Sequence, residues 1–219
     1  MLACFRRLCS DSGTKWKGLE RLPRRIVIAV TGASGAIYGY RLLQKLREQE
    51  NLQIHLVMSR SAEKTSKLEL DLLVKDWKLL SDYSYQIEDV GARLASGSFH
   101  TDGMAVCPCS IHTLSAIAAG VSSNLIVRAA DVCLKERRRL VLAVRETPFH
   151  LGHLRAMTAV TEMGAIVAPP IPGFYHKPQT ILDLVDHSVH RVMDLLGVPH
   201  PAAARWQDIK EDSKDAQDE

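Results

Sequence analysis

Residues 24–39 read RRIVIAVTGASGAIYG and indicate the fold class. The stretch opens with a continuously apolar, β-branched run from Ile26 to Val30, which is typical of a parallel strand covered on both faces. Gly32 and Gly35 follow, and a helical pattern begins beyond them. Glycine allows a tight turn in which backbone N–H groups approach an anion, and a helix N-terminus favours negative charge. The stretch therefore predicts a strand, a turn and a helix. The turn either receives a phosphate-bearing ligand or only packs the helix against the strand.

The same alternation continues along the chain. The strands expected from apolar runs are residues 24–31, 53–58, 104–107, 140–144 and 165–168. The helices expected from amphipathic spacing are residues 40–50, 61–80, 111–119, 125–136, 152–163 and 181–196. Residues 169–180 hold four prolines and must form a loop. This order predicts a three-layer α/β fold of Rossmann or flavodoxin type, with a parallel sheet and helices on both faces.

Bulk composition fits one enzyme-sized domain. The chain has 219 residues, of which 46% are hydrophobic, which suffices for a single buried core. A net charge of +3 is too weak to indicate nucleic-acid binding, and no apolar run approaches the roughly 18 residues of a membrane span. The five cysteines follow no disulfide pattern, which favours a reducing compartment. The pair Cys107 and Cys109 is interpreted as small residues at a buried strand end.

The two ends of the chain differ in charge from the middle. Residues 1–23 carry arginine and lysine with few acids and resemble a mitochondrial presequence, although a disordered basic leader has the same composition. The domain is expected over residues 24–206. Residues 207–219 carry six acidic side chains against two lysines and are expected to form a disordered tail.

Polar residues follow the later strands at the points where such a sheet binds ligands. Ser110 comes after the strand that Pro108 is expected to close, and it is placed either to cap a helix or to contact a flavin. Arg145 and Glu146 follow the strand at 140–144, where they form a structural ion pair or contact a ligand.

Dehydrogenase chemistry fits the glycine turn less well. The second strand ends in Ser59 and Arg60 and lacks the acidic residue that holds the ribose of NAD. Arg60 leaves only NADP open. No cluster of ligands at metal spacing is present around His150 and His153, which are interpreted as packing or capping residues.

Four long motifs resemble those of one known protein family. TGASGAIYGYRLL, SGSFHTDGMAVCPCSIHTLSAIA, RAADVCLKERRRLVLAVRETPFHLGHLRAMT and PPIPGFYHKPQT resemble the UbiX, or phenylacrylate-decarboxylase-associated, family of flavin prenyltransferases over residues 25–206. The resemblance implies a flavodoxin-like fold, a large homo-oligomer that is typically a dodecamer with sites at subunit contacts, and no need of a metal. It implies transfer of a dimethylallyl group from dimethylallyl monophosphate to N5 and then C6 of reduced FMN. It also implies that the prenylated flavin serves a UbiD-type decarboxylase.

The resemblance also assigns roles to individual residues. The expected FMN contacts are Gly32, Ala33, Ser34, Ser59, Ser110, Ile111, His112, Thr113 and Arg145. The residues expected to hold the prenyl phosphate are Lys135, Tyr175 and Arg191. The expected catalytic residues are Ser34, Lys135, Glu146 and Trp206, with Glu146 as an acid near the phosphate and Trp206 as an aromatic wall over the prenyl group. His112 departs from the Lys or Gly of many relatives, which leaves the local electrostatics around the flavin open.

Simpler explanations exist for two of these residues, because Arg191 lies on a polar helix face and Trp206 could anchor the tail. Two other functions share the fold and the flavin. One is an FMN-dependent cysteinyl decarboxylase, whose usual Pro-Ala-Ser-Ala-Asn-Thr-like stretch is replaced here by residues 108–113. The other is a non-catalytic FMN carrier, which is disfavoured by the presence of Lys135, Glu146, Tyr175 and Arg191.

Overall fold

The computed structural model describes residues 23–203. The basic leader expected at residues 1–23 lies outside this range except for its last residue. The acidic tail at 207–219 and Trp206 also lie outside it.

A single parallel sheet of six strands organises the described residues. The strands are β1 (Arg24–Val30), β2 (Leu52–Met58), β3 (Tyr83–Tyr85), β4 (Gly103–Cys109), β5 (Arg139–Val144) and β6 (Ile166–Val167). Their order across the sheet is β3-β2-β1-β4-β5-β6, and every neighbouring pair is parallel. This is the doubly wound arrangement, in which the order reverses on the two sides of β1. The expected α/β fold with a parallel sheet is therefore confirmed.

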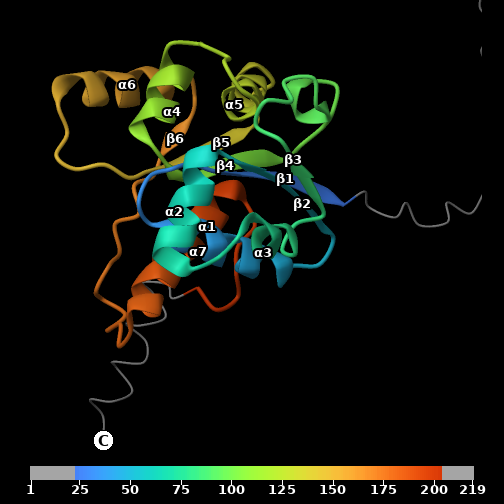
Figure 1. Ribbon diagram of the computed structural model, residues 1–219. Helices are drawn as coiled ribbons and strands as arrows, with labels where there is room; N and C mark the ends of the chain where they lie inside the picture. The colour runs from blue at the N-terminus through green and yellow to red at the C-terminus, as the bar shows by residue number, and fades with distance from the viewer. Residues whose placement is uncertain (1–22, 204–219) are drawn as a thin grey trace, which may run out of the picture.

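Helices cover both faces of the sheet, as Figure 1 shows. The helices are α1 (Ala36–Arg47), α2 (Arg60–Leu70), α3 (Val74–Lys78), α4 (Ile111–Ala118), α5 (Leu125–Lys135), α6 (Leu151–Glu162) and α7 (Ile181–Leu196), with a short 3-10 helix at Arg93–Ala95. The first three helices and α7 lie on one face, while α4, α5 and α6 lie on the other (Figure 1).

The alternation of side chains along β1 builds two cores. Ile26, Ile28 and Val30 are fully buried against the leucines of α1 and the apolar stripe of α7. Val27 and Ala29 point to the opposite face and join the core beneath α4 and α5. A strand that is buried on both faces needs the continuous apolar sequence seen at residues 26–30.

Three local features differ from the sequence-based expectation. The helix expected at 61–80 is two helices, because Asp71 ends α2 in the left-handed conformation with φ of 58°. Strand β3 was not expected, since three residues are too few to show a period. Pro108 does not close β4, which runs on to Cys109 with a shift in its pairing to β5.

Helix α7 is held at both ends and along its length. Thr180 and Asp183 form a capping box at its start, and Gly197 ends it in the left-handed conformation. Asp186 accepts two hydrogen bonds from Arg41 of α1, at 2.8 and 2.5 Å. These contacts fix the first half of α7 beside α1. Within residues 23–203 no helix is long and apolar enough to cross a membrane.

Candidate functional site

The reversal of strand order places the main site between β1 and β4. The connection after β1 leads to helices on one face, and the connection after β4 leads to α4 on the other. A crevice therefore forms between the two connections, at the carboxyl ends of β1 and β4. Thr31 ties the two strand ends together. Its hydroxyl donates to the carbonyl of Pro108 at 2.7 Å and accepts from the N–H of Ser110 at 2.8 Å. Residues 31 and 110 therefore form a fixed floor for the opening.

A cavity of about 830 Å³ opens at this point. We call it the switch-point cavity. Its lining consists of Thr31, Gly32, Ser59, Arg60, Ser61, Ile87, Glu88, Val90, Ser110, His112, Thr113, Ser123, Asn124 and Ile126. The volume lies in the range of small-molecule and cofactor sites. Five of the expected FMN contacts belong to this lining, namely Gly32, Ser59, Ser110, His112 and Thr113.

The chemistry of this lining suits a flavin nucleotide. Ser59 and Ser110 cap α2 and α4, so the N-termini of two helices lie beside the cavity. Helix N-termini and hydroxyl groups favour a phosphate and a polyhydroxylated chain, and Ile87, Val90 and Ile126 supply apolar surface. The one carboxylate in the lining, Glu88, is paired with Arg60 at 2.7 Å. The capping explanation for Ser110 is confirmed, and the residue lies in the cavity as well.

Gly32 is required by close packing. A Cβ atom at this position would lie 2.3 Å from Cβ of Ser61, which no side chain tolerates. The turn after β1 can therefore lie against the start of α2 only when residue 32 is glycine. Ala33 is buried and Ser34 is exposed beside it. Of the three residues of the expected first loop, Gly32 therefore lines the switch-point cavity, and Ala33 and Ser34 follow it in the turn.

Glu69 is a residue beside the expected first loop that sequence reasoning missed. Its carboxylate accepts hydrogen bonds from the N–H groups of Gly35 at 2.9 Å and Ala36 at 2.8 Å, and from the side chain of Ser34. Burial acts to raise the pKa of Glu69, but these hydrogen bonds and the charge of Arg145 outweigh it and hold the pKa below its ordinary value. An acid of this chain therefore occupies the N-terminus of α1, where the glycine turn alone suggested a bound phosphate.

Arg145 and Glu146 do not form the ion pair that was considered for them. Glu146 is half-buried and accepts a hydrogen bond from the N–H of Thr147 at 3.0 Å. Among the described residues it makes no salt bridge. Arg145 is exposed, and its charge lowers the pKa of Glu69 and opposes the rise in the pKa of Tyr38, which is caused mainly by burial. Both residues therefore face the same end of the sheet as Ser34.

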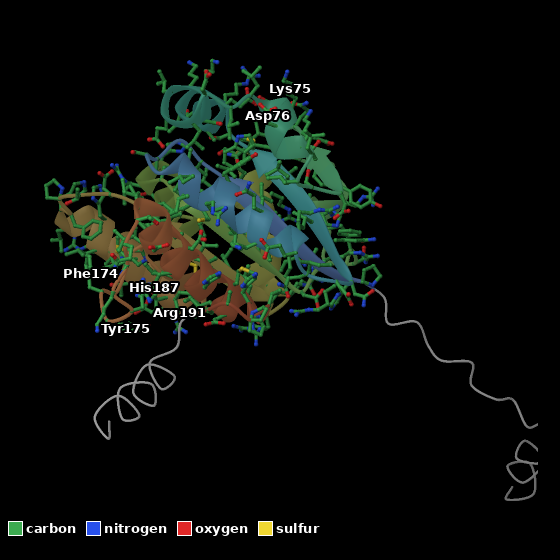
Figure 2. All side chains as sticks on the ribbon, turned by 90° about the horizontal axis from the view of Figure 1, so that it is seen from below. Lys75, Asp76, Phe174, Tyr175, His187 and Arg191 are labelled. Atoms are coloured by element: carbon green, nitrogen blue, oxygen red, sulfur yellow. The ribbon has the colours of Figure 1, made fainter. Side chains whose placement is uncertain are left out.

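A second group of expected residues gathers along α7 and the loop before it. Figure 2 shows Tyr175, His187 and Arg191 together at one edge of the molecule. The hydroxyl of Tyr175 lies 3.0 Å from Nε2 of His187, and Arg191 is exposed one turn further along the helix. Arg41 and Asp186 join this part of α7 to α1. Tyr175 thus lies in the loop after β6, and Arg191 lies further along α7.

Lys135 is not brought to this group within one chain. It ends α5 immediately before β5 begins, whereas Glu146 follows the far end of β5. A six-residue strand spans about 20 Å, so the two residues lie at opposite edges of the sheet. Lys135 pairs with Glu136 and lines a separate cavity of about 490 Å³ with Asp131, Arg137 and Glu162. The fourth expected catalytic residue, Trp206, is outside the described range.

The two cysteines of β4 belong to the core. Cys107 and Cys109 are buried, and burial raises the pKa of both thiols, that of Cys107 to about 12. The interpretation of this pair as buried strand-end residues is confirmed.

Comparison with known proteins agrees with this geometry. The Flavoprotein family model matches residues 17–193. The flavin prenyltransferase UbiX of Escherichia coli K12 is 50% identical over 186 residues, covering 84% of this chain and 98% of the relative. A crystal structure of AnUbiX with FMN and dimethylallyl pyrophosphate aligns with a TM-score of 0.82 at 50% identity, covering 84% of this chain and 97% of that one. A dodecameric FMN-dependent UbiX-like decarboxylase from Escherichia coli O157:H7 also gives 0.82, at 48% identity over 84% and 99% of the two chains. The chain therefore belongs to the UbiX family of flavin prenyltransferases.

Proposed function

We propose that this protein joins a dimethylallyl group from dimethylallyl monophosphate to N5 and then C6 of reduced FMN, and that the prenylated flavin is made for a UbiD-type decarboxylase. The observation that carries the proposal is the switch-point cavity, whose hydroxyl groups and two helix N-termini suit FMN, in a chain half identical to flavin prenyltransferases. The structural relative AnUbiX binds FMN and a dimethylallyl phosphate ester together. Reduced FMN, when bound, supplies the two nucleophilic positions.

On the flavin side, the chain binds and orients. Ser59, Ser110 and Thr113 line the cavity with hydroxyl groups, and His112 is exposed at its wall. Gly32, Ala33 and Ser34 form the turn along one edge, and Ile111 begins α4 along the other. Arg145 lies where its positive charge reaches Glu69 and Tyr38. We assign these residues to FMN binding and Ser34 also to the reaction.

On the donor side, the chain stabilises a leaving phosphate. Tyr175 and Arg191 present a hydroxyl group and a guanidinium at the same edge of the molecule (Figure 2), and guanidinium groups bind phosphate strongly. Glu146 carries a carboxyl group that no ion pair neutralises within residues 23–203. It is therefore suited to share a proton with the departing phosphate. Trp206 is assigned to the wall over the prenyl group, where an aromatic face stabilises developing positive charge.

The position of Lys135 requires more than one subunit. Because Lys135 and Glu146 lie at opposite edges of the sheet, one chain does not bring this lysine to the phosphate. We propose that Lys135 of a neighbouring copy completes the site in a homododecamer. The dodecameric relative from Escherichia coli O157:H7 supports this assembly. No nucleic acid takes part.

We also propose that residues 24–206 form the catalytic domain and that the acidic residues 207–219 follow it as a tail. Residues 1–23 would direct the protein to mitochondria, because they carry five arginines and lysines against two acids. Uptake of the full chain by isolated mitochondria, compared with a chain that begins at residue 24, tests the leader. Equal uptake of both chains would contradict it.

The function is tested by a coupled assay. The protein is incubated without oxygen with FMN, a reductant and dimethylallyl monophosphate, and the small-molecule fraction is added to a UbiD-type decarboxylase purified without its cofactor. We expect decarboxylation only when the prenyl donor was present. Carbon dioxide release from a peptidyl-cysteine substrate would instead favour a cysteinyl decarboxylase. Tight FMN binding with no transfer of activity would favour a carrier.

A further inference from the structure

The loop before α7 encloses an imidazole ring that the proposed chemistry does not yet use. His187 of α7 is contacted by three residues of the loop at 169–180. Nε2 of His187 lies 3.0 Å from the hydroxyl of Tyr175, and Nδ1 lies 3.3 Å from the backbone nitrogen of Gly173. The ring of His176 stacks on that of His187 with centroids 4.6 Å apart and planes within 5°. Figure 2 shows His187 of α7 beside Tyr175 and Arg191.

The two contacts of His187 determine where its proton resides. A backbone N–H is always a donor, so Nδ1 of His187 must accept from Gly173 and carries no hydrogen. A neutral imidazole has one N–H, which must then be on Nε2. Nε2–H therefore donates to Tyr175, and the tyrosine oxygen accepts in this pair. A phenol that accepts one hydrogen bond in this way turns its own O–H towards a different partner.

The surroundings keep this arrangement in place. Burial, and then the charge of His176, lower the pKa of His187, which favours the neutral ring at pH 7. The loop also passes too close for a side chain at residue 173, where a Cβ atom would lie 2.7 Å from the ring of Tyr175 and 3.3 Å from the ring of His187. Glycine therefore lets the backbone N–H reach Nδ1.

We propose that His187 is a positioning residue that makes Tyr175 a hydrogen-bond donor to the phosphate of the prenyl donor. The proposal rests on the proposed function, because it gives Tyr175 a phosphate to bind. Arg191 lies one turn beyond His187 on α7, so the guanidinium and the oriented hydroxyl approach the anion from one helix and one loop. A phosphate oxygen accepts from both groups and donates to neither.

Steady-state kinetics with varied dimethylallyl monophosphate at saturating reduced FMN test this role. We expect His187→Leu to raise KM for the phosphate ester about tenfold, the effect of losing one well-directed hydrogen bond to a charged group, with an unchanged Kd for FMN. His187→Gln should restore most of the loss, because its amide N–H replaces Nε2–H. Adding Tyr175→Phe to His187→Leu should not raise KM any further, because His187 acts through Tyr175. His100→Leu, the same change at an exposed histidine far along the chain, is the matched control and should leave KM unchanged.

Three results would overturn the proposal: a wild-type KM in His187→Leu, equal losses in the Gln and Leu variants, or additive effects of His187→Leu and Tyr175→Phe. A nitrogen-15 spectrum of histidine-labelled protein gives an independent answer, with His187→Gln used to assign the signal. We expect a neutral ring protonated at Nε2, and protonation at Nδ1 would contradict the argument. This spectrum does not depend on turnover. If the wild-type protein forms no prenylated flavin, the proposed function fails, while the spectrum still decides the orientation of the His187–Tyr175 pair.

Discussion

Thr31 and Ser110 are joined by a 2.8 Å hydrogen bond in which the buried threonine hydroxyl accepts from the serine N–H. The same hydroxyl donates to Pro108 at 2.7 Å, so one side chain holds the ends of β1 and β4 at the floor of the switch-point cavity. Thr31→Val keeps the shape but removes both bonds and leaves the N–H of Ser110 without this acceptor. We expect a loss of about 1–3 kcal/mol in the free energy of unfolding, measured by urea denaturation, and weaker FMN binding. Thr31→Ser retains the hydroxyl and should keep FMN binding near wild type, and equal binding by the Val variant would contradict the bracing role.

Glu69 holds the turn that carries Ser34. Its carboxylate contacts the N–H groups of Gly35 and Ala36 and the Ser34 side chain. Glu69→Gln keeps the size but removes the charge at the N-terminus of α1, so we expect a stability loss below about 1 kcal/mol. The single uncharged amide oxygen cannot accept from Ser34 as well as from both N–H groups, so the Ser34 hydroxyl loses its charged acceptor and product formation should fall by about one to two orders of magnitude. Glu63→Gln on the exposed face of α2 is the control, and a rate equal to that of this control would refute the anchoring role.

Glu146 is expected to act in the chemistry and not in the fold. Its one hydrogen bond recorded among the described residues comes from the neighbouring N–H of Thr147, which a glutamine oxygen also accepts. Glu146→Gln should therefore change the free energy of unfolding by no more than about 0.5 kcal/mol and leave the Kd for FMN unaltered. Product formation should fall about 100-fold, as expected for a lost acid–base group. Normal turnover at saturating dimethylallyl monophosphate would remove Glu146 from the catalytic residues.

His55 makes stability depend on pH. It is fully buried in β2, and the centroid of its ring lies 4.9 Å from that of Tyr83 and 5.4 Å from that of Phe99. Burial, together with the charges of Arg93 and Arg25, lowers its pKa from 6.5 to about 4. The folded protein thus binds fewer protons at this residue than the unfolded chain. The contribution of neutral His55 to the free energy of unfolding is therefore complete above pH 6.5, and it is lost as the pH falls from 6.5 to about 4.

The loss attributable to His55 is on the order of 3 kcal/mol over that interval. Urea denaturation of wild type and His55→Gln at several pH values measures it, since the glutamine does not titrate. The variant should be less stable at pH 7 and should lose less stability on acidification. Parallel pH profiles for the two proteins would show that His55 does not titrate in this way.

The sequence predicts an element well when the apolar pattern of that element alone marks where it begins and ends. The apolar run at residues 26–30 marks β1, and the stripe from Ile181 to Leu196 gives the bounds of α7, because burial imposes a period on each. The end of α2 at Asp71 leaves no such mark, since the apolar residues Leu70, Leu72 and Leu73 continue across the break.

Contacts between distant segments are what the sequence does not reveal. Glu69 lies 33 residues from Ala36, and Thr31 lies 79 residues from Ser110, so their partners are defined only by the fold. The strand ends correctly indicate the switch-point cavity, since parallel strands gather their carboxyl ends at one edge. The residues expected around the prenyl phosphate do not all follow strand ends. Lys135 precedes β5 and Glu146 follows it, so the fold of one chain separates them, and we proposed that a neighbouring copy supplies this lysine.

The most direct test of the account is the mass of the flavin after one anaerobic reaction. Full-length protein with bound FMN is reduced, mixed with dimethylallyl monophosphate, quenched and analysed by mass spectrometry, with Glu146→Gln and a reaction without the prenyl donor alongside. We expect the wild-type protein to convert FMN into a species heavier by one prenyl unit, and the variant to do so far more slowly. Recovery of unmodified FMN alone, from folded wild-type protein that had bound both ligands, would contradict the claim that this chain prenylates flavin.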